Sequence, residues 1–269
     1  MPSTKPKEAE PSLHQVEATW SPYERLGRAK SMLRGAWRRL GFSRIAATTL
    51  RYELDMALLR GFGLVSPSYR RQVRALSRRR ELRVHLGCGN ALFPGWINLD
   101  CYPPRHEPGV EVLVLDMRRG LPLAEASVRS VYSEHFFEHV PFEIVRHGLV
   151  PEMLRILEPG GVARIGVPDG EYFAKNYVAT RQGQADPLYV EHLGSRTPME
   201  MLNDVVHGFT HHFLYDYETL ETIFREAGFV DLRRGFAHDS RVEDFRGRDR
   251  KDPWRERMTL YIEGQRPVS

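Results

Sequence analysis

From Leu82 onward, short apolar runs alternate with polar turns and amphipathic stretches, and this alternation constrains the fold more than any other feature of the chain. Five such runs are RVHLGCG, GWINLD, VEVLVLDM, SVRSVYSEHF and VARIGVPD. Helices are expected over about 141–157 and 216–228, and two more strands, VDLRRGF and MTLYIEG, complete the pattern. The alternation predicts an α/β fold with a Rossmann-like, mostly parallel sheet and an antiparallel last strand, which is compatible with a hairpin at the sheet edge.

The charge is distributed unevenly along the chain. Residues 1–80 carry 17 Lys and Arg against 6 Asp and Glu, a net charge of +11, whereas the remainder carries 22 against 29, a net charge of −7. We therefore predict a disordered tail over 1–20, a basic helical N-terminal region over 21–81, and a Rossmann-like domain over 82–269 with a lid insertion at about 171–217.

The N-terminal region is expected to form three helices. The first is basic and amphipathic, with apolar residues at helical spacing (Leu26, Leu33, Trp37, Leu40) and arginines between them (Arg25, Arg28, Arg34, Arg38, Arg39). The others are expected over about 44–60 and 68–81. Either these helices pack on the following domain and present their arginines to water, or they contact an anionic lipid surface or acidic partner. No nucleic-acid-binding motif accompanies the charge, so nucleic acid is not an expected partner.

Composition excludes several classes. No run approaches the roughly 20 apolar residues of a membrane span, and the N-terminus lacks the apolar stretch of a secretory signal. A soluble protein of the cytoplasm is expected, with membrane association through the basic helices as an alternative. The two cysteines, Cys88 and Cys101, form no C-x-x-C motif, so neither a disulfide nor a zinc knuckle is expected.

Polar residues collect where the predicted strands end. Gly87 and Gly89 follow the first strand, Asp100 the second, Asp116 the third, residues 133–139 the fourth, and Asp169 the fifth. Ligands of open α/β sheets bind at this edge, and a carboxylate ending the second strand suits a ribose diol. The pattern favours a nucleoside-bearing cofactor. It fits a dinucleotide poorly, because Leu92 replaces the third glycine of that fingerprint.

At these residues the chain resembles class I S-adenosylmethionine-dependent methyltransferases with a type-11 methyltransferase domain. The resemblance rests on HLGCGN, PGWINLD, LPLAEASVRSVYSEHFFEHV, EMLRILEPGGVARIGVPD and YDYETLETIFREAGF. It implies S-adenosylmethionine as the cofactor, with the turn against its methionine half, Asp100 on the ribose and Asp116 beside the adenine. The full expected set of cofactor contacts is Gly87, Cys88, Gly89, Asn90, Asp100, Asp116, Met117, Ser133 and Glu134.

Two local features depart from that family. Where many members carry an acid two places before the first glycine, this chain has His85. The link from Gly89 to Trp96 is too short for a full first helix, so we expect turns to cradle the cofactor there.

The segment SEHFFEHVP is the richest in candidate catalytic groups. Methyl transfer to oxygen needs an oriented acceptor and a base or a metal for its proton, and His135, Glu138 and His139 are candidates for either role. Their spacing resembles the Glu-x-x-Glu-His of quinone-biosynthesis O-methyltransferases, which bind a divalent metal there, with His135 in place of the first acid. His139 is equally compatible with a capping role.

The predicted lid insertion carries further histidines. His207, His211 and His212 concentrate there with Tyr215. His211 or His212 is the next choice for the base, since histidine titrates near working pH, although ordinary packed histidines would give the same pattern.

The predicted activity is O-methylation of a saccharide or another small hydroxylated acceptor, and the runner-up is O- or N-methylation of a natural product. Two remote alternatives are a zinc hydrolase, because residues 135–139 also spell H-x-x-E-H, and a binding module without catalysis. Nothing in the sequence indicates the oligomeric state.

Overall fold

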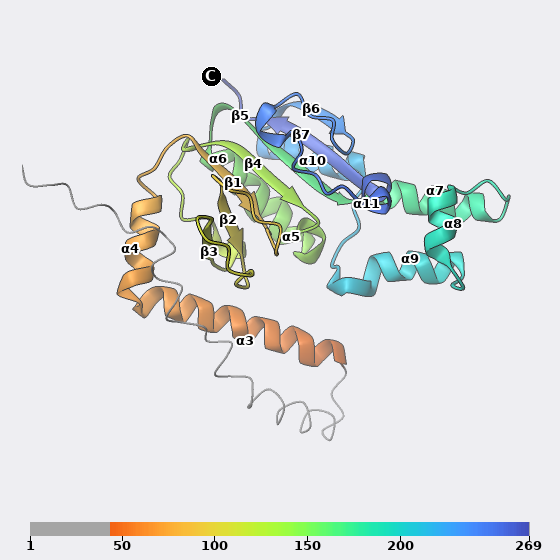
Figure 1. Cartoon of the computed structure of the whole chain (residues 1–269), viewed down its shortest axis with the longest axis horizontal. Coiled ribbons are helices and arrows are strands. Elements are labelled where there is room, and N and C mark those ends of the chain that lie inside the picture. The colour runs from red at the N-terminus through yellow and green to blue at the C-terminus, as the bar shows by residue number, and fades with distance from the viewer. Residues whose placement is uncertain (1–43, 269) are drawn as a thin grey trace, which may run out of the picture.

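The computed structural model describes residues 44–268 (Figure 1). The predicted tail over 1–20 and the basic amphipathic helix around Leu26 to Leu40 lie outside these residues.

A seven-stranded sheet forms the centre of the molecule, in the order β3-β2-β1-β4-β5-β7-β6 (Figure 1). Its strands are β1 (Leu82–Leu86), β2 (Ile97–Asp100), β3 (Glu111–Val114), β4 (Val128–Glu134), β5 (Leu157–Pro168), β6 (Val230–Gly235) and β7 (Thr259–Gln265). Pairs from β3 to β5 are parallel, and β7 runs antiparallel to both β5 and β6. The predicted Rossmann-like fold and antiparallel last strand are confirmed. Strand order reverses between β1 and β4, which is where open sheets bind ligands.

One face of the sheet is covered by helices. These are α5 (Phe142–Ile144), the π-helical turn η5 (Val145–Leu149), α6 (Val150–Ile156) and α10 (Tyr217–Ala227), which bury the main apolar core. The predicted helix over 141–157 is therefore present, but its middle residues, Val145–Leu149, form a π-helical turn and not a regular α-helix. Pro151 lies at the start of α6 and has no N–H for the helical ladder, which accounts for the irregularity.

The other face is covered by loops. Phe93 and Trp96 from the link between β1 and β2 pack with Tyr132 of β4 and with Phe245, which lies in η7 (Glu243–Phe245) on the connection between β6 and β7. Residues 87–96 contain no helix, as expected from the shortness of this link. The same connection ends in α11 (Pro253–Met258).

A buried ionic network fastens that connection to the sheet. The fully buried Arg164 of β5 donates to Asp249 at 2.6 Å and to Glu263 of β7 at 2.7 Å, and its guanidinium lies 4.2 Å from the ring centre of Tyr261. A charge without water is tolerable only when paired in this way.

The N-terminal region contributes α3 (Arg44–Val65) and α4 (Pro67–Leu76). Figure 1 shows α3 passing beneath β2 and β3 on the side where these strands end. Ser66 caps α4 by accepting from the Tyr69 N–H, and Met56, Leu59 and Leu76 are buried. The helix expected over 68–81 ends early, because Arg78, Arg79 and Arg80 supply no apolar face to extend it.

The insertion after β5 forms a small helical layer of its own. It consists of α7 (Gly170–Thr180), α8 (Pro187–Leu193), α9 (Pro198–His207) and the 3₁₀ turn η6 (Gly208–Thr210), around a separate apolar cluster that includes Phe173, Tyr189 and Met201. These helices extend beyond the end of the sheet (Figure 1). Within residues 44–268, no helix is both long and apolar enough to cross a bilayer.

Candidate active site

The glycine turn after β1 is open on its outer side. Gly87 and Gly89 have φ of 65° and 49°. A Cβ on Gly87 would lie 2.3 Å from Phe136, whereas a Cβ on Gly89 would meet no atom within 4 Å. The backbone at Gly89 is therefore accessible to a ligand at close range.

Asp100 holds this turn in place from the end of β2. Its Oδ2 accepts from the Gly89 N–H at 2.8 Å, and its Oδ1 accepts from the Tyr102 N–H at 3.0 Å. The Asn90 side chain accepts from the Arg105 N–H at 2.9 Å and links the turn to the loop after β2. The sequence therefore brings Gly89, Asn90 and Asp100 together, as predicted.

Asp116, after β3, is tied to two arginines that the sequence analysis did not single out. Arg60 of α3 donates to its Oδ2 at 2.5 Å, and Arg118, in the 3₁₀ turn η3 (Met117–Arg119), donates to its Oδ1 at 2.8 Å. Burial acts to raise the pKa of Asp116, but the guanidiniums of Arg118 and Arg60 outweigh it, so this pKa lies below its ordinary value. Arg118 also donates to Glu53 of α3 at 2.6 Å. A cofactor that uses Asp116 has to share it with these arginines or displace one of them.

Three other predicted cofactor contacts are buried. Met117 packs in the main core, the Cys88 thiol is buried with a raised pKa, and the Ser133 hydroxyl is enclosed without a hydrogen-bond partner among the described residues. Glu134 accepts from the Tyr261 hydroxyl at 3.0 Å.

His85 is the next-to-last residue of β1, and its side chain lies on the loop-covered face of the sheet. Its ring stacks on Phe93 with centroids 4.2 Å apart, and burial lowers its pKa to about 3. It is a neutral packing residue there.

His135 stands at the end of β4 in a left-handed conformation, with φ of 54°. Its Nε2 lies 2.9 Å from the Thr259 hydroxyl of β7, and its Nδ1 lies 3.1 Å from Oε1 of Glu138. Positive φ is uncommon for residues other than glycine, although histidine adopts it more often than most, and such conformations concentrate at functional sites.

Glu138 is fully buried in the 3₁₀ turn η4 (Phe137–His139), and neither of its carboxylate oxygens has a hydrogen bond of acceptable geometry from any described residue. Burial acts to raise its pKa, but the imidazoles of His135 and His139 favour the charged form more strongly, so this pKa lies below its ordinary value. A buried, charged and poorly partnered carboxylate is unusual and needs an explanation.

The insertion after β5 places one of its histidines near this carboxylate. The rings of His139 and His211 are 4.8 Å apart in an edge-on arrangement, and ligand atoms of Glu138, His139 and His211 all lie within 4.8 Å of one another. We call His135, Glu138, His139 and His211 the histidine cluster. The side chain of His212 is exposed and does not join it, although the His212 N–H donates to the Glu138 carbonyl at 2.6 Å.

Residues 97–165 match the model of a family described as a methyltransferase domain. This match covers β2 to β5 and the residues from Asp100 to Glu138. This part of the chain is therefore similar in sequence to a methyltransferase domain.

Several solved structures are similar to this methyltransferase at low sequence identity. A SAM-dependent methyltransferase from Archaeoglobus fulgidus is 18% identical, with 80% of this chain and 99% of that chain covered and a TM-score of 0.45. An S-adenosylmethionine-dependent methyltransferase from Mesorhizobium loti is 17% identical, with coverages of 75% and 99% and a TM-score of 0.42. A possible histamine N-methyltransferase from Thermotoga maritima is 18% identical, with coverages of 83% and 96% and a TM-score of 0.40. At this level the similarities carry no information on the acceptor. Among curated proteins, none matches the chain.

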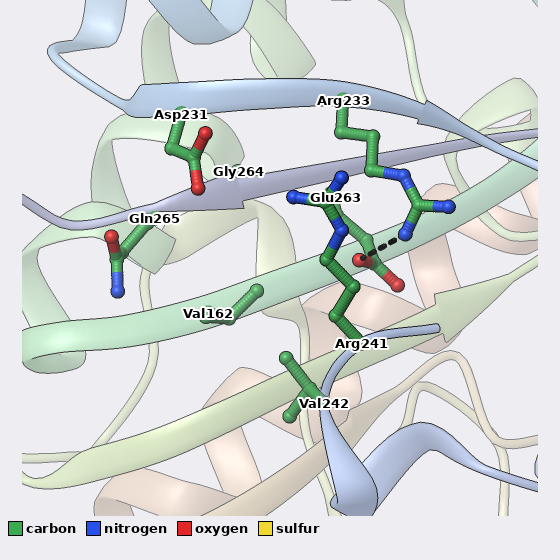
Figure 2. A pocket seen from close by; sticks show the side chains of 8 residues that line it. All are labelled: Val162, Asp231, Arg233, Arg241, Val242, Glu263, Gly264 and Gln265. Atoms are coloured by element: carbon green, nitrogen blue, oxygen red, sulfur yellow. Dashed lines mark ion pairs between the residues drawn. The ribbon is translucent and has the colours of Figure 1, made fainter. Parts of the chain in front are cut away.

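The methyltransferase also has a shallow pocket far from these residues (Figure 2). It lies where β6 begins, at Asp231, and where the antiparallel β7 ends, at Gln265, with Arg233 and Glu263 4.0 Å apart along one side. Because parallel strands begin at this edge, the pocket is at the opposite end of the sheet from the glycine turn, and we assign it no part in methyl transfer.

The H-x-x-E-H alternative does not fit the geometry. Its two histidines would have to share one face of a regular helix, but His135 ends a strand and His139 ends a single 3₁₀ turn.

Proposed function

We propose that this methyltransferase transfers a methyl group from S-adenosylmethionine to a hydroxyl oxygen of a small acceptor, with a saccharide as the first acceptor to test. The observation that carries the proposal is the methyltransferase-domain match combined with an open glycine turn, fastened by Asp100, at the point where strand order reverses.

The residues at the strand ends fit the cofactor. The turn of Gly87, Cys88, Gly89 and Asn90 would lie along its methionine half, because the open backbone at Gly89 admits close approach. Asp100 would accept from the ribose hydroxyls while it still holds the turn. When bound, S-adenosylmethionine supplies an electrophilic methyl group on a sulfonium leaving group.

The acceptor would lie between the glycine turn and the helical layer of α7 to α9. The histidine cluster would border the acceptor at the end of β4. His211, which directly follows η6, is the member that the insertion contributes. These side chains would orient the acceptor hydroxyl and take up its proton, and the helical layer would keep water away from the reacting atoms. The candidates for proton removal within the cluster are His135, Glu138, His139 and His211, whereas the exposed His212 lies outside it.

The test is a turnover assay with purified protein. We expect calorimetry to detect S-adenosylmethionine binding, and we expect S-adenosylhomocysteine to form when hydroxylated saccharides are supplied. Turnover of amines or phenolic natural products alone would favour the runner-up acceptor class. Binding without turnover on any acceptor class would favour a non-catalytic module, and absence of binding would refute the proposal.

Contact of the basic N-terminal region with an anionic surface also remains a proposal. Some arginines of this region form ion pairs with carboxylates of the sheet domain: Arg60 pairs with Asp116, and Arg79 pairs with Glu111. In contrast, α3 exposes Leu50, Leu54 and Leu58 at four-residue spacing, which places them on one helix face. Co-sedimentation with vesicles that contain phosphatidylglycerol, but not with neutral vesicles, would support this contact.

A further inference from the structure

We propose that Glu138, His139 and His211 form a binding site for one divalent transition-metal ion, which joins the end of β4 to the lid insertion. The set differs from the one that the quinone-methyltransferase spacing implies, because it includes a lid residue and leaves His135 out. The proposal concerns cation binding and does not depend on methyl transfer.

The first argument is the state of Glu138. Its side chain is fully buried, and neither oxygen has a hydrogen-bond donor of acceptable geometry within residues 44–268. An enclosed carboxylate of this kind costs several kcal/mol unless a positive charge compensates it. His135 Nδ1 lies 3.1 Å from Oε1 but does not meet the geometry of a hydrogen bond.

The second argument is the tautomer of His211. Its Nδ1 lies 2.6 Å from the carbonyl oxygen of Val205. A carbonyl only accepts, so Nδ1 carries the proton and Nε2 presents a lone pair. Metal-binding histidines are commonly oriented in this way, with the second ring nitrogen donating to a backbone carbonyl.

The same reasoning applies to His139. Its Nδ1 lies 3.4 Å from the Thr210 hydroxyl, whose own hydrogen is donated to the Phe209 carbonyl. Thr210 therefore accepts from His139 Nδ1, which leaves Nε2 of His139 unprotonated. With its proton on Nδ1, the His139 ring presents the Nε2 lone pair to a metal ion.

The third argument is the backbone that delivers His211. Phe209 and Thr210 have φ of 53° and 65°, and both are non-glycine residues in the left-handed region. Such a conformation is strained and persists only where its surroundings enforce it. This strained turn directs Thr210 and His211 at His139.

The donor set selects the class of cation. Two neutral imidazoles and one carboxylate suit Zn²⁺, Co²⁺, Mn²⁺ or Fe²⁺, and they leave coordination positions open to water or a ligand. Ligands about 2.1 Å from a tetrahedral ion lie about 3.4 Å apart, so atoms that now lie within 4.8 Å of one another would have to draw together by up to about 1.4 Å.

The test measures cation binding by the full-length protein after treatment with a chelator. Titration with Zn²⁺ in a calorimeter should show one ion per chain at this site, and Co²⁺ should give the visible absorption bands of a nitrogen-bearing site. Zn²⁺ should also raise the melting temperature, because it binds the folded state. None of these measurements requires an acceptor or S-adenosylmethionine.

The variants are His211→Ala and Glu138→Gln, and His212→Ala is the matched control, since it removes an exposed neighbouring histidine and keeps the backbone. We expect each of the first two to weaken Zn²⁺ binding by at least about 100-fold, while His212→Ala binds as the unchanged protein does. Glu138→Gln removes the buried charge and should fold even if His211→Ala does not. The proposal is overturned if the unchanged protein binds no ion at millimolar Zn²⁺, if Glu138→Gln retains full affinity, or if His212→Ala weakens binding as much as His211→Ala.

Discussion

Replacement of His85 tests whether the loop-covered face of the sheet is as dry as its packing indicates. His85 is buried with its ring on Phe93, and burial lowers its pKa to about 3 from an ordinary value of 6.5. Below pH 6.5 the unfolded chain takes up a proton here that the folded chain does not, so the free energy of unfolding falls as pH falls.

The size of the effect follows from these two values. At pH 5.5, one unit below the unfolded pKa, the loss relative to neutral pH is about 1.4 kcal/mol, and at pH 5.0 it is about 2 kcal/mol. Because the folded pKa lies well below this range, the unfolded value alone sets the loss. His85→Gln and His85→Leu should lack this contribution, whatever their packing costs at neutral pH.

The assay is urea unfolding followed by tryptophan fluorescence, at several pH values between 7.5 and 5.0. The unchanged protein should lose about 1.4 kcal/mol more than either variant between pH 7.5 and 5.5. If all three proteins lose stability in parallel, His85 is protonated in the folded state, and the account of a neutral, buried imidazole is wrong.

Three further predictions concern the turn and the ionic network. Asp100→Ala should weaken S-adenosylmethionine binding by about 1 to 3 kcal/mol in calorimetry, because a ribose hydroxyl loses a charged acceptor; unchanged affinity would remove Asp100 from the site. Gly87→Ala should cost about 2 to 4 kcal/mol of stability in chemical denaturation, since its Cβ has no room, whereas Gly89→Ala should cost only about 1 to 2 kcal/mol for its backbone conformation; equal costs would contradict the contact geometry. Asp249→Ala should cost about 3 to 5 kcal/mol by leaving Arg164 buried with one partner fewer, and a loss below about 1 kcal/mol would mean that water reaches the guanidinium.

Much of the fold could be predicted because its signals are local. The apolar runs that begin at Leu82 are bounded by glycines and carboxylates, and the Asp216 cap and Gly228 stop delimit α10. The start of β5 was not predictable in this way. Pro159 and Gly160 suggested a break before Val162, but a bulge lets β4 pair with β5 from Leu157, so the strand begins five residues earlier. A bulge depends on the partner strand, which no local pattern reveals.

The candidate site shows the same division. The hydrogen bond from Gly89 to Asp100 joins residues 11 positions apart within one strand-turn-strand unit, and the sequence pattern places both residues at the same edge of the sheet. The ion pair of Arg60 with Asp116 spans 56 positions, and the contact of His139 with His211 joins two separate segments of the chain. Residue spacing carries no signal for such contacts, so the sequence does not predict the ion pair of Arg60 with Asp116. The sequence indicates His211 as a candidate base because of its chemistry, but only the fold places it beside His139.

The ion pairs between α3 and the loop after β3 limit where the chain can be truncated to make a shorter fragment. The family match begins at Ile97, and the sheet begins at Leu82, so either position would be a natural place to start a shortened fragment. A fragment that starts at Leu82 would lose Arg60 and Glu53, and it would expose the surface that Met56 and Leu59 now cover. Asp116 would then keep Arg118 alone, and the loop after β3 would lose the cover of α3. Recombinant fragments for binding studies should therefore retain α3 in full.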